Sequence, residues 1–178
     1  MSGSLRRWPT LAGIAVAALT AYGLSSGTDL APILAASGLV YLGAAALRRP
    51  ATAWAVFFGT FVVITVTKFV AGVDATWILL AAAVLVLGYG LLRGATRPAR
   101  GLPLQTIAMV AFGGAAAVAL LVDETVGSYL VAAGLLGHAA WDAYHHRVNR
   151  VVVRSMAEFC LVLDAVVAAA IVLVTVRG

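Results

Sequence analysis

Ionisable side chains gather on one face of an apolar stretch near the end of the chain. The stretch 127–146 contains His138, Asp142 and His145, and His146 follows directly. At about 100° per residue in a helix, Asp142 lies about 40° from His138 around the axis, and His145 lies about 20° to the other side of His138. One helical face therefore presents an imidazole, a carboxylate and a second imidazole.

The next apolar stretch, 156–176, adds Glu158, Cys160 and Asp164. A short basic loop joins the two stretches, so we expect them to form antiparallel helices that lie side by side. Residues at equal depth can then be paired by counting outward from the loop. The three predicted pairs are His138 with Asp164, Asp142 with Cys160, and His145 with Glu158.

A charged group inside a membrane needs a partner. An ionised aspartate at the centre of a spanning helix costs at least about 2.5–3.5 kcal/mol, so Asp142 and Asp164 are expected to face inward. A buried pair of a carboxylate and an imidazole can exchange a proton near neutral pH, because histidine titrates in that range. The pattern is therefore typical of a proton relay.

The same residues are suitable metal ligands. Imidazole nitrogens and carboxylate oxygens bind zinc, and residues four or seven apart share a helical face. His138, Asp142 and His145 could supply three ligands, with Glu158 or Asp164 completing the site, and three protein ligands plus water is the arrangement of catalytic zinc. No HExxH motif is present. The weaker ligand candidates are His146 and Cys160.

Each of these residues also has a simpler interpretation. His138 and Asp142 can join helices by hydrogen bonds, His145 and His146 can lie among the headgroups, Glu158 can complement a helix N-terminus, and Cys160 can be a small packing residue. Three functions stay open. The protein binds a proton or divalent cation and couples this to transport, or it is a metal-dependent enzyme acting on a lipid-like substrate with Glu158 as general acid or base, or it is a structural subunit.

The chain that holds these residues has the composition of a membrane protein. Hydrophobic residues make up 63% of its 178 positions and charged residues 11%, whereas soluble proteins hold about 25% charged residues. Seven apolar runs are each near the roughly 20 residues that a helix needs to span the bilayer, and an isolated segment satisfies its backbone in lipid only as a helix. We expect one all-α domain, 1–178, with seven transmembrane helices at 9–25, 30–47, 51–70, 76–92, 104–122, 127–146 and 156–176.

The connectors between the runs alternate in charge. Lys and Arg collect in cytoplasmic loops, so the order predicts a plasma-membrane protein with its N-terminus inside and its C-terminus outside. This topology and contact with anionic lipid account for the net charge of +5, so we do not expect nucleic-acid binding. Oligomeric state is left open. The basic segments contain Arg6 and Arg7, Arg48 and Arg49, Arg93, Arg97 and Arg100, and Arg147, Arg150 and Arg154; the acidic ones contain Asp29, Asp74, and Asp123 with Glu124.

A weak internal repeat accompanies this alternation. Asp29, Leu42 and Gly43 recur as Asp74, Leu87 and Gly88, and again as Asp123, Leu136 and Gly137. Three outward-facing helix hairpins followed by a seventh helix would fit the repeat, and so would chance similarity between apolar helices.

Small residues are expected to mediate the helix contacts, because lipid removes the hydrophobic drive between helices. Tyr41 and Tyr89 lie inward of the predicted interfaces and receive no role from the sequence. The glycines expected at helix contacts are Gly13, Gly38, Gly59, Gly88, Gly90, Gly113, Gly114, Gly134 and Gly137.

Overall fold

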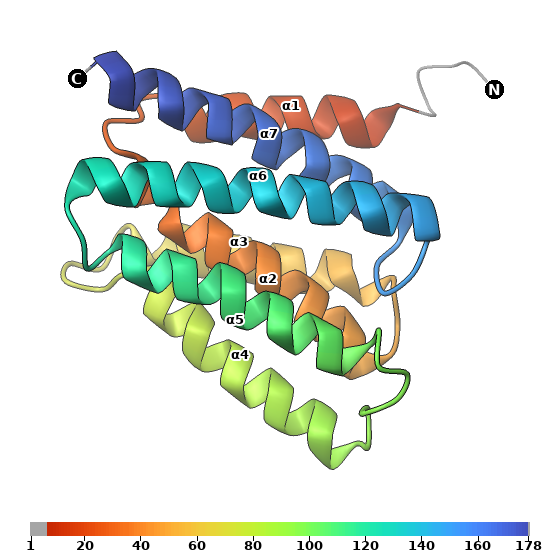
Figure 1. Ribbon diagram of the computed structural model, residues 1–178. Helices are drawn as coiled ribbons and strands as arrows, with labels where there is room; N and C mark the ends of the chain where they lie inside the picture. Colours follow the sequence, from red (N-terminus) through yellow and green to blue (C-terminus); the bar gives the residue numbers. More distant parts are fainter. Residues whose placement is uncertain (1–6, 178) are drawn as a thin grey trace.

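The protein is an all-helical bundle in the computed structural model, which describes residues 7–177 (Figure 1). About 80% of the described residues are helical and none of them lies in a strand, which confirms the all-α prediction. Arg6, part of the first predicted basic cluster, lies outside the described residues. The helices are α1 (Trp8–Ala21), the short 3-10 helix η1 (Gly27–Leu30), α2 (Ala31–Leu47), α3 (Thr52–Thr67), α4 (Ala75–Leu92), α5 (Leu102–Ala119), α6 (Glu124–Val148) and α7 (Arg154–Arg177).

Within residues 7–177, four segments are long and apolar enough to cross a membrane. They are η1 with α2 (Gly27–Leu47), α4, α5 and α7. α1 and α3 are apolar but only 14 and 16 residues long. α1 ends earlier than the predicted run 9–25 because Tyr22 is extended and Gly23 adopts a left-handed conformation with φ of 71°.

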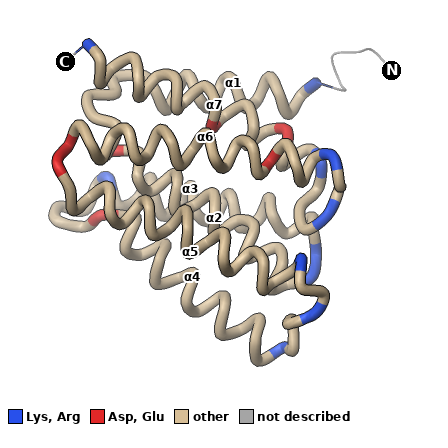
Figure 2. The backbone as a smooth tube through the Cα atoms, viewed as in Figure 1, with Lys and Arg blue, Asp and Glu red and all other residues tan. Residues whose placement is uncertain are grey.

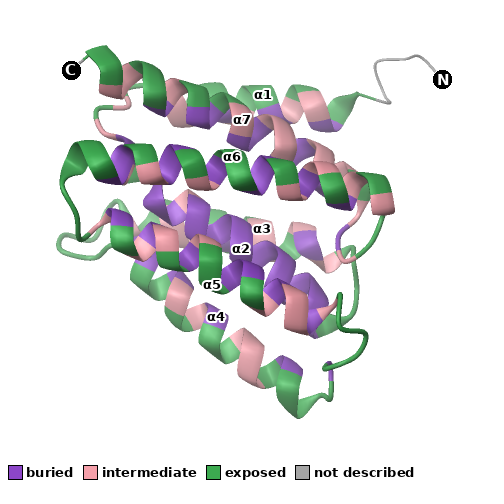
Figure 3. Cartoon of the chain, in the orientation of Figure 1, coloured by how far each residue is buried: buried purple, intermediate pink, exposed green. Residues whose placement is uncertain are grey.

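The helix α2 is the centre of the bundle. It packs against α3, α4, α5 and α6, and nearly all of its residues are buried. Figure 3 shows this as an almost unbroken buried ribbon. A helix that is apolar all round belongs in an interior, and its many alanines and glycines let neighbouring backbones approach. Any polar side chain on α2 is therefore directed into protein.

The antiparallel pair α6 and α7 forms the second main feature of the fold. α1 packs against α7 rather than along α2, and a Cβ at Gly13 would lie 2.8 Å from the carbonyl oxygen of Phe159. The first of the three predicted hairpins, 9–25 with 30–47, is therefore open. Its connector η1 packs instead against α6 and α7, where the backbone N–H of Gly27 donates to Ser128 Oγ at 3.1 Å.

The glycines divide into two groups. A Cβ would lie within 3.0 Å of another atom at Gly13, Gly38, Gly90, Gly113 and Gly134, as expected of contact residues. The prediction was wrong at Gly59, Gly88 and Gly114, where a Cβ would meet nothing within 4 Å because these positions face away from the bundle; Gly137 has only an ordinary contact. Two glycines that the sequence analysis did not single out, Gly27 and Gly127, are among the most tightly packed.

Most of the charged residues in the loops lie at one of the two ends of the bundle according to their sign (Figure 2). The basic loops α2–α3, α4–α5 and α6–α7 share one end, and the acidic positions before α2, α4 and α6 share the other. Two of the acidic residues cap helices: Asp74 Oδ1 accepts from the N–H of Thr76 at 2.7 Å, and Asp123 Oδ1 accepts from that of Thr125 at 2.9 Å. The alternation of charge along the sequence thus becomes a polarity of the folded bundle.

Candidate functional site

Three ionisable side chains meet inside the bundle, and we call His138, Asp142 and Asp164 the buried triad. None of the three residues has measurable solvent exposure. His138 Nδ1 lies 2.7 Å from Asp164 Oδ2 and 3.1 Å from Asp142 Oδ2. A single imidazole nitrogen therefore faces both carboxyl groups.

The helices α6 and α7 create this arrangement. His138 and Asp142 are one turn apart on α6, and Asp164 comes from the antiparallel α7. The pairing of His138 with Asp164 agrees with the depth count from the α6–α7 loop. Both aspartates are buried inside the bundle, as expected for carboxyl groups on otherwise apolar helices.

A fourth residue, Tyr41, completes the hydrogen bonding of Asp142. Its hydroxyl donates to Asp142 Oδ1 at 2.5 Å, and only 1% of Tyr41 is exposed. Tyr41 belongs to α2, so the triad region joins the central helix to α6 and α7. Phe112 of α5 closes the site, since its ring lies edge-on to the His138 imidazole with centroids 5.0 Å apart.

Several buried atoms of the triad lack a hydrogen bond. They are His138 Nε2, Asp142 Oδ2 and Asp164 Oδ1. An unsatisfied buried polar atom costs about 1–3 kcal/mol, more when it is charged, and a bound water or ion is one way to satisfy it. One ligand atom from each triad residue can be chosen so that all lie within 4.8 Å of one another. The triad therefore has the donors and the spacing to hold a small cation.

His145, predicted as a ligand beside Asp142, is directed elsewhere. It is buried, but its Nδ1 lies 2.9 Å from the carbonyl oxygen of Trp141, and its Nε2 lies 3.3 Å from Gln105 Nε2. An amide nitrogen only donates, so Nε2 accepts and Nδ1 carries the proton. Both nitrogens of a neutral imidazole are thus occupied outside the triad.

Glu158 also lies apart from the triad. Its Oε1 accepts a hydrogen bond from Thr10 Oγ1 of α1 at 2.5 Å, and its Oε2 lies 3.9 Å from His146 Nε2. The predicted pairing of His145 with Glu158 was wrong, because the face of α6 toward α7 follows residues spaced by four. That row contains His138, Asp142 and then His146, and it leaves His145 turned toward α5.

Cys160 packs within its own helix. Its Sγ lies 3.5 Å from Met156 Sδ, and the side chain is buried. The predicted partner at its depth, Asp142, bonds instead to Tyr41 and contacts His138. Cys160 therefore borders the site without joining its hydrogen bonds.

The sequence pattern does not predict the roles of two polar residues of the site, Tyr41 and Gln105. Tyr41 was noticed inside an apolar run but given no role, and its partner lies 101 residues further along the chain. Gln105 lies at the edge of the predicted run 104–122, where a polar residue is expected at the level of the lipid headgroups. The helix begins at Leu102, which carries Gln105 inward, and no part of it is exposed.

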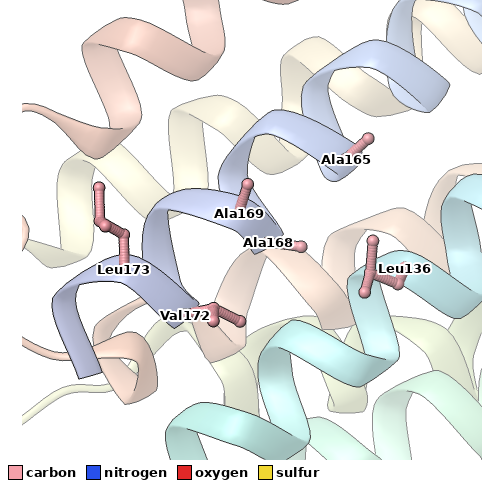
Figure 4. A pocket seen from close by; sticks show the side chains of 6 residues that line it. All are labelled: Leu136, Ala165, Ala168, Ala169, Val172 and Leu173. Atoms are coloured by element: carbon pink, nitrogen blue, oxygen red, sulfur yellow. The ribbon is translucent and has the colours of Figure 1, made fainter. Parts of the chain in front are cut away.

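An apolar groove lies on the seam of α6 and α7 close to the triad. It has a volume of about 330 Å³. Figure 4 shows alanine, valine and leucine side chains around it, so it offers surface for hydrocarbon and no group for chemistry. Its lining residues are Leu136, Ala165, Ala168, Ala169, Val172 and Leu173.

Comparisons with known proteins identify no relative: no family model, no curated protein and no solved structure matches this chain. The buried triad is the strongest candidate for a functional site in the described residues, because its three groups are ionisable, buried and close together.

Proposed function

We propose that this chain is a multi-pass membrane protein that binds a proton or a divalent cation at the buried triad and couples that binding to transport. The observation that carries the proposal is the position of His138 Nδ1 between two fully buried carboxylates. We place the protein in the plasma membrane with the basic end of the bundle at the cytoplasmic face, as the distribution of arginine favours.

Charge balance explains why the ligand is a proton or a divalent cation. With a neutral imidazole and both carboxylates ionised, the triad carries two negative charges, which a buried site does not hold unpaired. Two added protons make it neutral, for example as an imidazolium, one carboxylate and one carboxylic acid. One divalent cation bound to the neutral imidazole and two carboxylates gives the same zero charge. Protons and a divalent cation therefore compete for one site.

The ligand chemistry agrees with this exchange. Imidazole nitrogen and carboxylate oxygen bind zinc and related transition metals. The proton on His138 Nδ1 occupies the space between the two carboxylates, so a cation would take its place. The Tyr41 hydroxyl donates to Asp142 Oδ1 and so leaves Asp142 Oδ2 as the oxygen that faces His138.

The alternative of a metal-dependent enzyme acting on a lipid-like substrate has less support from the positions of its predicted residues. Its ligand set required His145 beside His138 and Asp142, with Glu158 as general acid or base. His145 is bonded to Gln105 and Trp141, and Glu158 is bonded to Thr10 of α1. Ion binding needs only the three residues that are in contact.

A binding measurement on the purified protein in lipid nanodiscs tests the proposal. Zn²⁺ and Mn²⁺ are titrated by calorimetry at two pH values, and proton uptake is followed with a pH-sensitive dye in proteoliposomes. We expect D164N to lose cation binding at least tenfold and to lose the proton signal. D29N is the matched control, because Asp29 is a carboxylate of the acidic end whose Oδ2 accepts from Ser25 at 3.2 Å in an exposed contact.

Equal ion binding by D164N and D29N would overturn the proposal. If neither ion binds to the wild type and D164N only lowers the unfolding temperature, the triad joins helices and the structural alternative holds.

A further inference from the structure

A second candidate site lies at the basic end of the bundle. A hollow of about 500 Å³ opens between the C-terminal end of α2, the α4–α5 loop and the α6–α7 loop. These three segments are far apart in the sequence and supply five arginines to its lining. The arginines are Arg48, Arg49, Arg97, Arg100 and Arg150.

The positive charge of this hollow is not balanced by protein. No aspartate or glutamate lines it, and within residues 7–177 no arginine lies within salt-bridge distance of a carboxylate. Arg48 is held by a hydrogen bond from its guanidinium to the carbonyl oxygen of Gly94. Arginines that converge without acidic partners repel one another, and a bound anion would relieve this repulsion.

The floor of the hollow has the opposite character. Ala44, Ala45 and Leu102 line it and are at least 90% buried, so the arginines surround an apolar base. A free inorganic anion would gain nothing from such a base. An anion that is joined to hydrocarbon would place its charge among the arginines and its apolar part on the alanines.

The backbone around the hollow is unusual. Arg48 and Asn149 end their helices in the left-handed conformation, with φ values of 53° and 49°. Val151 has a positive φ of 70° at the centre of a tight turn, in which the N–H of Val152 donates to the carbonyl oxygen of Arg150 at 2.9 Å. Left-handed backbone is a common helix end for Asn, but it is strained for a β-branched residue such as valine. Strain of this kind costs about 1–3 kcal/mol and is often found at ligand sites, and here it falls on the residue that follows Arg150.

We infer that this hollow binds the phosphate headgroup of an anionic phospholipid. Arginine guanidinium groups match phosphate oxygens in geometry and charge, and basic pockets at the cytoplasmic ends of membrane helices are suited to lipid headgroups. The apolar floor contacts the glycerol and the first methylene groups of the lipid. This binding is independent of the buried triad, which lies deeper in the bundle.

Two variants with the same loss of charge test the inference. R49Q/R97Q/R100Q removes three arginines of the hollow, and R93Q/R147Q/R154Q removes three from the same end that do not line it. Short-chain phosphatidylglycerol, phosphatidylcholine and free glycerol phosphate are titrated into each protein in neutral detergent, with binding read by native mass spectrometry. We expect phosphatidylglycerol to bind at least tenfold more weakly to the first variant and within twofold of wild type to the second.

Several results would overturn the inference. Equal weakening in both variants would mean that general attraction to the basic end explains binding. Phosphatidylcholine or free glycerol phosphate binding as tightly as phosphatidylglycerol would exclude an anionic lipid as the preferred ligand. The single variants R97Q and R100Q replace exposed side chains and preserve the test if the triple variant does not fold, with a loss of at least threefold expected for each.

Discussion

The hydroxyl of Tyr41 donates a 2.5 Å hydrogen bond to Asp142, and this contact joins the most buried helix of the bundle to the triad. The bond links α2 to α6 across 101 positions of sequence. Asp142 also contacts His138, so Tyr41 of α2 orients one of the two carboxyl groups that share this imidazole. A residue on the central helix thus positions an ionisable group of α6.

Y41F is expected to destabilise the protein by about 1–3 kcal/mol, because it removes one donor from a buried carboxylate without changing the packing of the ring. The unfolding free energy in detergent measures the loss. Y89F is the matched control, since Tyr89 is 45% exposed on α4. A loss of equal size in the two variants would contradict the role given to Tyr41.

H138A is expected to cost about 3–5 kcal/mol, because it leaves two buried carboxyl groups without the imidazole that they share. H146A should cost less than about 1 kcal/mol, since the His146 side chain is 41% exposed and its contact with Glu158 is long, at 3.9 Å. Chemical denaturation of both variants checks the difference. A double variant H138A/D164A that loses as much as the two single losses added would show that the two residues do not interact.

Q105L is expected to remove the hydrogen bonds that join Gln105 of α5 to Trp141 and His145 of α6. The Gln105 amide accepts from Trp141 Nε1 at 3.3 Å and lies 3.3 Å from His145 Nε2, so its loss leaves two polar groups without a partner. We expect a loss of about 1–3 kcal/mol and a shifted indole N–H resonance of Trp141 in a nitrogen-15 spectrum. The neighbouring variant T106V should leave that resonance in place, because Thr106 Oγ1 bonds the carbonyl oxygen of Leu102 in its own helix.

The parts of the site that follow from local pattern were predictable from the sequence. His138 and Asp164 are ionisable residues in adjacent apolar runs joined by a short loop, so antiparallel packing brings them to one depth. Tyr41 and Gln105 were not predictable in this way, because their partners are set by how distant helices pack. The sequence predicts His145 opposite Glu158, and the structure has His146 there. The cause is related, because the angle between α6 and α7 decides which row of α6 residues faces α7.

In the fold, too, local features could be predicted from the sequence and contacts between distant helices could not. Apolar runs and charged connectors indicated the seven helices, and the alternation of charge agrees with the separation of acidic and basic ends (Figure 2). The open first hairpin could not be predicted, because every run is apolar and offers no sign of its neighbour. The packing of α1 on α7 depends on the close approach at Gly13, which looks like any other glycine in the sequence.

G127A is expected to destabilise the bundle by about 1–3 kcal/mol, because the added methyl group would overlap the carbonyl oxygen of Ala119 and the side chain of Thr28. G114A is the control within a neighbouring helix. A Cβ there meets nothing within 4 Å, and alanine favours a helix by up to about 1 kcal/mol over glycine, so this variant should be neutral or more stable. Thermal unfolding of both variants checks the prediction, and equal effects would show that Gly127 is not at a tight contact.

Cation binding at the buried triad is expected to release protons. The neutral triad holds two protons more than the form with a neutral imidazole and two carboxylates. A divalent cation that binds this second form brings its charge to zero, so both added protons are released. Apparent affinity should therefore rise by up to about 100-fold per pH unit while the empty triad stays fully protonated. Calorimetry in buffers of different ionisation enthalpy counts the protons released per cation. D164N keeps one carboxylate and should release at most one, and a wild-type protein that binds a cation with no proton release would contradict the exchange of protons for metal at this site.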